Sequence, residues 1–229
     1  MKDGLLERMR ATGHWRVVLR PIAPLSERLS FKQCATLVEN ARVSLRGWDY
    51  PHISHRQDQQ GGSGRTDSYY ENWCDWMTQV EFWRMYRSGQ FLSYNALDDD
   101  LRHDPQPMGD ERYLNVVGAI YQVAEIVEFT HRLAAAVDMD EGIGLQLSLV
   151  NTYGRHLQAG RGRMPFFDVQ RAGSETIAIE RQLDPAALKK GAPIHALSVL
   201  LELFDCFGWN PEPNQIRGDI EGLYRREFR

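Results

Sequence analysis

A change of hydrophobic period within residues 113–149 indicates a core built from both helices and strands. The helical part covers residues 113–137, where one apolar stripe consists of Val116, Ile120, Val123 and Val127. The strand part follows at once, because Ile143, Leu145, Leu147 and Leu149 alternate with Gly144, Gln146 and Ser148. Such alternation is typical of a strand that buries one face.

Further elements are expected on both sides of this segment. We predict strands over residues 15–20, 43–45, 91–97, 166–171 and 176–182, the last two forming a hairpin. We predict helices over residues 31–41, 70–88, 185–190, 193–207 and 213–228; Ser30 and Gln33 form a capping box before the first. The helix over 70–88 is expected because Trp73, Trp76, Met77, Val80 and Trp83 follow helical spacing.

This order of elements predicts an α+β protein with a mostly antiparallel sheet, packed helices and a helical C-terminal segment. We expect a single domain over residues 1–229, since no clear linker interrupts the chain. The glycine- and serine-rich residues 57–67, predicted to be a mobile surface loop, are one alternative sub-boundary, and the segment 104–112 is the other.

The composition excludes several classes of protein. The formal net charge of −4 does not favour a general affinity for nucleic acid or anionic membranes. Three widely spaced cysteines fit a reduced protein better than a disulfide scaffold. Residues 1–10 lack the apolar run of a secretory signal, and the apolar residues 196–207 are too few to cross a bilayer. We therefore expect a cytoplasmic protein that does not contact a membrane.

The segment Arg-Gly-Trp-Asp-Tyr-Pro-His-Ile-Ser-His, residues 46–55, carries the densest set of functional side chains. Asp49, His52 and His55 are ligand types that zinc or iron accepts. However, Pro51 prevents an ordinary helix here, and no further ligand follows at a motif spacing. The alternative is a rigid turn in which the two aromatic residues anchor to the core and the histidines face solvent.

Acidic side chains define two further candidate metal sites. Asp168 and Glu180 lie on the predicted hairpin, as do the carboxylates of metal-dependent nucleases of the PD-(D/E)xK type. The sequence departs from that pattern, because Gln182 stands where the lysine is expected. The cluster Asp98-Asp99-Asp100 offers oxygen ligands to Mg²⁺ or Ca²⁺, but the EF-hand pattern is absent, and a solvated exit from the preceding strand is the favoured interpretation.

A glycine-rich segment over residues 154–163 contains Arg155, Arg161 and Arg163. Arginines on such a loop suit a phosphate or carboxylate ligand, although no Walker A motif is present. The alternative is a solvated loop whose arginines pair with acidic neighbours.

Aromatic residues are concentrated between Trp48 and Tyr94, which hold eleven of the 24 in the chain. Much of this set is expected in the core, while the tyrosines are candidates for a pocket or a contact surface. No serine or cysteine nucleophile lies in a recognisable catalytic motif.

Three segments carry a resemblance to a known group: residues 45–52 (LRGWDYPH), 83–91 (WRMYRSGQF) and 204–209 (FDCFGW). They resemble an uncharacterised bacterial module found in some proteins with a Schlafen-like, AlbA-type ATP-binding domain. The resemblance implies a bacterial accessory protein linked to antiphage defence, and it implies no catalytic residue or cofactor.

Two functional hypotheses follow. The first is a bacterial cytosolic binding module for a protein partner or nucleic acid, without a cofactor or metal; its binding residues are Arg46, Trp48, Tyr50, His52, Arg155, Arg161 and Arg163. The alternative is a metal-dependent hydrolase or nuclease that uses Asp49, His52 and His55, or Asp168 and Glu180. The partly apolar last helix either packs internally or pairs with a second copy of the chain.

Overall fold

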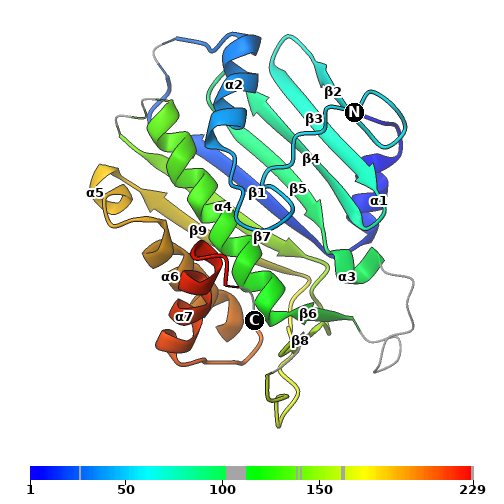
Figure 1. Cartoon of the computed structure of the whole chain (residues 1–229), viewed down its shortest axis with the longest axis vertical. Coiled ribbons are helices and arrows are strands. Elements are labelled where there is room, and N and C mark those ends of the chain that lie inside the picture. The colour runs from blue at the N-terminus through cyan, green and yellow to red at the C-terminus, as the bar shows by residue number, and fades with distance from the viewer. Residues whose placement is uncertain (26, 102–111, 138, 140, 161–162, 228–229) are drawn as a thin grey trace.

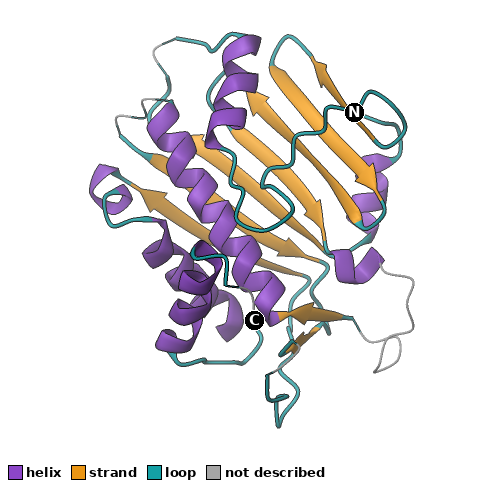
Figure 2. Cartoon of the chain, in the orientation of Figure 1, coloured by secondary structure: helices purple, strands orange, loops and turns teal. Residues whose placement is uncertain are grey.

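The computed structural model describes residues 1–25, 27–101, 112–137, 139, 141–160 and 163–227. In this part of the chain, seven strands form one antiparallel sheet in the order β2-β3-β4-β5-β1-β7-β9, and β6 pairs with β8 in a small parallel ladder (Figures 1 and 2). The α+β prediction is therefore confirmed. The strands are β1 (His14–Pro21), β2 (Gly61–Arg65), β3 (Tyr69–Trp76), β4 (Gln79–Tyr86), β5 (Phe91–Ala96), β6 (Tyr113–Asn115), β7 (Ile143–Val150), β8 (His156–Gln158) and β9 (Thr176–Leu183).

Helices cover one face of the sheet and part of the other. They are α1 (Leu5–Ala11), α2 (Phe31–Ala41), α3 (Asp98–Leu101), α4 (Val116–Ala136), α5 (Pro185–Leu188), α6 (Ala192–Asp205) and α7 (Pro213–Tyr224). Figure 1 shows α4 crossing the sheet diagonally, with α2 at one side and α6 and α7 at the other. The predicted helices at residues 31–41, 113–137 and the C-terminal segment are confirmed, with small shifts of their ends.

The main core lies between α4 and the central strands. Alternate residues of β1 and β7 point to α4, and they are Trp15, Val17, Leu19, Leu145, Leu147 and Leu149. The apolar stripe of α4 covers them, with Ile120, Val123 and Val127 fully buried. Burial of this apolar surface is the main stabilising contribution to the fold.

The opposite face of the sheet is covered only in part. Leu5 and Met9 of α1 pack against Trp73, Val80 and Phe82 of β3 and β4 and form a second, smaller core. Helix α1 therefore holds the β3–β4 end of the sheet from behind (Figure 1).

The predicted helix over residues 70–88 is wrong. These residues form the hairpin β3–β4, in which Trp73 pairs with Phe82 and Trp76 with Gln79. The helical spacing of the tryptophans does not correspond to one buried face, because Trp73 faces α1 while Trp83 belongs to the core under α4. Aromatic and β-branched side chains favour strands, and two-sided burial within a sheet stabilises them here.

Three other local predictions need correction. Residues 43–45 form no strand, and only an isolated bridge joins Val43 to Tyr50. The edge strand β2 occupies the middle of the predicted loop 57–67. Residues 166–171 do not pair with β9, which pairs with β7 instead. The predicted sub-boundary at 104–112 falls outside the described residues except for its last position.

Among the described residues, no helix combines the length and the apolar composition that a bilayer crossing requires.

Candidate functional site

The segment between α2 and β2 crosses the helix-covered face of the sheet and closes a cavity against α4 (Figure 1). The cavity has a volume of about 210 Å³. Its walls come from the segment 46–50, β4, β5, α3 and the first turns of α4. The polar residues among its lining are Arg46, Asp49, Gln79, Glu81, Asn95, Asp98, Asp99, Asn115, Gln122 and Glu125.

Glu81 on β4 is a buried carboxylate at the floor of this cavity, with 4% of its surface exposed. The indole Nε1 of Trp48 donates to its Oε1 at 2.6 Å, and Nδ2 of Asn95 donates to its Oε2 at 2.5 Å. Burial raises the pKa of Glu81 to about 7, although these donors and the backbone N–H of His52 favour the ionised form. Glu81 can therefore gain or lose a proton near neutral pH.

Glu125 on α4 is the second buried carboxylate of the cavity, with 1% exposed. Arg46 lies against it, with Nε 3.1 and 3.0 Å from its two oxygens and Nη2 2.9 Å from Oε2. The same guanidinium donates to Oε1 of Gln122 at 2.9 Å. Burial raises the pKa of Glu125 to about 7, and the charge of Arg46 only partly opposes this effect.

Aromatic packing holds the 46–52 segment in place. Trp48 stacks on His52, with ring centroids 3.9 Å apart, and on Trp76 at 6.0 Å. The hydroxyl of Tyr50 is buried and lies 2.8 Å from Oγ of Ser93 on β5. The prediction that Tyr50 anchors this turn in the core is confirmed, whereas Trp48 is half-buried and packs on His52 and Trp76 outside the core. The turn places Arg46 and Trp48 on the cavity wall.

Sequence reasoning missed Glu81, Asn95 and Glu125. A signal was present for Glu125, because a carboxylate interrupts the apolar run of residues 123–127 on a helix otherwise predicted to be buried. Glu81 stands likewise between Val80 and Phe82. A charged residue is rarely buried without a partner or a function, so a carboxylate within an apolar run of sequence marks a candidate site.

Asp49, His52 and His55 do not converge on a metal site. Asp49 pairs with Arg42 at 3.3 Å, His52 stacks on Trp48, and His55 is exposed. In the described part of the chain, no three side chains of histidine, cysteine, aspartate or glutamate are grouped to hold a metal ion. These three residues therefore do not support the hypothesis of a metal-dependent hydrolase or nuclease.

The arginine segment is not a free anion-binding loop in the described part of the chain. Arg155 is fully buried and binds both carboxylate oxygens of Asp100, at 2.8 and 2.7 Å. Arg163 forms an ion pair with Asp219. Arg161 lies outside the described residues. The binding role predicted for Arg155 is replaced by a structural one, since a buried guanidinium cannot reach a surface ligand.

Asp168 and Glu180 are not arranged as a nuclease pair. Asp168 is exposed in a loop rather than on a strand. Glu180 is exposed on β9 and accepts a hydrogen bond of 2.9 Å from Gln146 of β7. The hairpin that would join the two carboxylates is absent, because β9 pairs with β7.

Comparison with protein-family models, with curated proteins and with solved structures found no match to this chain. The resemblance to the bacterial module described above stays a prediction. The function proposed below therefore depends on the residues of the cavity.

Proposed function

We propose that the chain binds a small polar ligand in the cavity between Glu81 and Glu125 and that binding changes the protonation of these carboxyl groups. The observation that carries the proposal is that two buried carboxyl groups, from β4 and α4, line one cavity and each have a pKa raised to about 7. Strongly shifted carboxyl pKa values in a concave site are typical of functional residues.

The chemistry fits such a role. A group whose pKa lies near the working pH is both an efficient proton donor and an efficient acceptor. The volume of about 210 Å³ is below the roughly 300–1,000 Å³ of pockets for drug-sized ligands. We therefore expect a ligand of metabolite size.

A cavity-filling substitution tests this proposal. Gly118 on α4 lines the cavity, and a Cβ atom added there meets only ordinary contacts, the nearest being Asn115 Oδ1 at 3.6 Å. Gly118→Leu should therefore add bulk at the cavity wall, with a Cβ atom that meets no tight contact. Gly218→Leu is the matched control, because Gly218 lies on the exposed side of α7 with open space around it.

The measurement is ligand-observed NMR with a mixture of small amines, carboxylic acids, amides and sugars. We expect at least one compound to bind the wild-type protein and Gly218→Leu, and binding to be lost in Gly118→Leu. Equal binding to Gly118→Leu, or no binding of any compound to the wild-type protein, would contradict the proposal.

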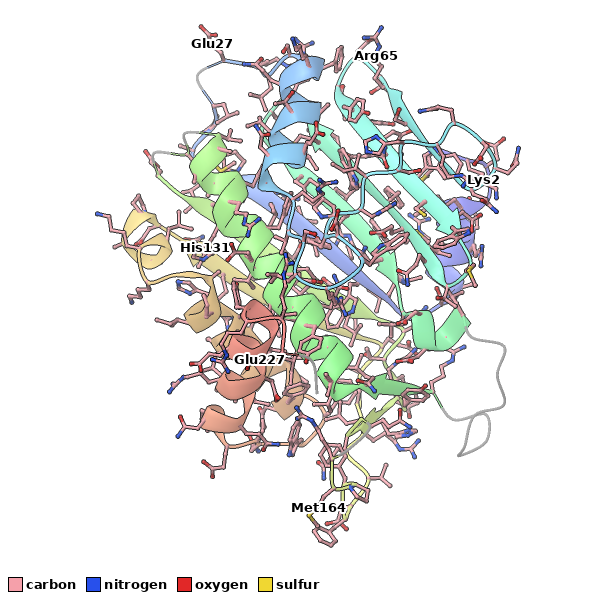
Figure 3. The ribbon with its side chains drawn as sticks, viewed as in Figure 1. Lys2, Glu27, Arg65, His131, Met164 and Glu227 are labelled. Carbon is pink, nitrogen blue, oxygen red and sulfur yellow. The ribbon has the colours of Figure 1, made fainter. Side chains whose placement is uncertain are left out.

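A second candidate function is recognition of a protein partner, as expected for a bacterial accessory module. It is favoured by an apolar loop segment, residues 164–169, in which Met164 is 78% and Phe167 94% exposed. Figure 3 shows Met164 at the far end of a loop that projects away from the sheet. Large exposed apolar side chains grouped together are typical of contact surfaces.

Co-purification from the host tests this second candidate. A specific partner should be retained by the wild-type protein and lost with Phe167→Ser. Met77→Ser is the control, because Met77 is 74% exposed in the distant β3–β4 turn. A partner that is retained equally by both variants does not use this loop.

A further inference from the structure

The two buried carboxylates of the cavity differ in their counter-charges. Glu125 has the guanidinium of Arg46 within 2.9 Å. Glu81 accepts hydrogen bonds only from the neutral donors of Trp48, Asn95 and His52, and no cation of the described residues pairs with it. A buried carboxylate without a counter-ion is costly, whereas the same group paired with a cation is stable.

The other cavity walls suit a cation. Five carboxyl side chains line the cavity, and they are Asp49, Glu81, Asp98, Asp99 and Glu125. Asp49 pairs with Arg42, and Glu125 pairs with Arg46. Carboxyl groups outnumber cationic side chains in the described lining, which disfavours an anionic ligand.

We propose that the ligand is a small organic cation whose ammonium group pairs with Glu81. This inference depends on the proposed function, since it names the class of ligand that the same cavity takes. The ammonium group supplies the positive charge that Glu81 lacks among the described residues. The cavity has room for about seven water molecules, and a short alkylamine has a similar volume.

The environment of Glu81 also predicts proton release on binding. Glu125 faces it from α4, Cys74 is its neighbour on β3, and His52 and Trp48 lie above it in the loop. An ammonium group placed here would favour the ionised carboxylate and displace its proton into solvent. Binding should therefore be weaker at low pH, where both carboxyl groups are protonated.

Isothermal titration calorimetry with three probes of similar shape tests the inference: n-butylammonium chloride, neutral 1-pentanol and sodium butanoate. At pH 8 we expect butylammonium to bind at least tenfold more tightly than pentanol, and butanoate not to bind. Glu81→Gln should weaken butylammonium at least tenfold and leave pentanol unchanged. Glu180→Gln, which removes an exposed carboxylate on β9, should change neither affinity.

Three other outcomes would contradict the inference, each for a different reason. Equal binding of pentanol and butylammonium to the wild-type protein would refute the cationic ligand but support the cavity as a binding site. If millimolar MgCl₂ competes as strongly as butylammonium for the cavity, the ligand is a metal ion rather than an organic cation. No binding of any probe, together with no effect of Gly118→Leu in the NMR screen, would refute the proposed function as well.

The wild-type protein alone provides a further test if Glu81→Gln does not fold. The affinity for butylammonium should fall at least tenfold between pH 8 and pH 5.5, and binding at pH 7 should release a fraction of a proton. An affinity that does not change with pH would overturn the assignment of Glu81 as the counter-ion.

Discussion

The indole Nε1 of Trp48 donates a hydrogen bond to Oε1 of Glu81, at 2.6 Å, across 33 residues of sequence. This bond joins the loop that closes the cavity to the strand that forms its floor. It also places an N–H donor on a carboxylate that burial would otherwise neutralise. The position of the loop and the protonation of Glu81 are therefore linked.

Trp48→Phe should raise the pKa of Glu81 further above about 7, by about one pH unit, because a hydrogen bond to a charged group contributes about 1.5 kcal/mol or more. The measurement is NMR titration of ¹³C-labelled glutamate carboxyl groups. Trp76→Phe is the control, since Trp76 stacks near Trp48 but makes no bond to Glu81. A shift of equal size in both variants would contradict the role of the hydrogen bond.

The two raised pKa values predict a specific dependence of stability on pH. A carboxyl group whose pKa is about 7 in the folded state and 4.5 in the unfolded chain stabilises the fold fully below pH 4.5. This contribution is lost as pH rises to about 7, at up to about 1.4 kcal/mol per pH unit for each group. The unfolding free energy of Glu81→Gln should therefore rise relative to that of the wild-type protein between pH 5 and pH 7.

Urea unfolding of both proteins across this range provides the measurement. His14, His52 and His131 have lowered pKa values because of burial, and they act in the opposite direction. These histidines are present in both proteins, so their effect cancels in the difference. A difference that stays constant with pH would show that Glu81 is ionised throughout.

Asp100→Asn should destabilise the protein by about 3 kcal/mol, because it leaves the buried charge of Arg155 without a counter-ion. Asp100 also accepts a hydrogen bond of 2.7 Å from the backbone N–H of Gly13, so the substitution weakens the contact between α3 and the residue before β1. Urea unfolding measures the effect, and Asp205→Asn, at an exposed position on α6, is the control. Similar stability of the two variants would mean that the ion pair contributes little.

Ser30→Ala should destabilise the fold by about 1 kcal/mol through the loss of the N-cap of α2. The side chain of Ser30 accepts from the backbone of Gln33, and the side chain of Gln33 accepts in return from the backbone of Ser30. Thermal unfolding is sufficient to measure the change. Ser68→Ala, in an exposed turn, should have a much smaller effect.

Periodic patterns and caps correctly predicted the elements whose burial is one-sided. The apolar stripe of α4, the alternation of β7 and the capping box of α2 each lie within one short segment of sequence. Each of these patterns is compatible with only one type of secondary structure. The hairpin β3–β4 was misread because Trp73 and Trp83 fit a helical spacing. Their burial on opposite faces of the sheet depends on α1 and α4, which lie far away in the sequence.

For the candidate site, too, some features follow from local sequence and others from tertiary packing. Local composition was enough to select the segment 46–55, since it is dense in aromatic, charged and imidazole groups. Its chemistry was decided by packing, which brings Trp48 to Glu81 and Arg46 to Glu125 across 33 and 79 residues of sequence. The same packing buries Arg155 and separates Asp168 from Glu180. Burial and counter-charge determine what a carboxylate or an arginine can do, and both depend on residues that are neighbours only in the folded chain.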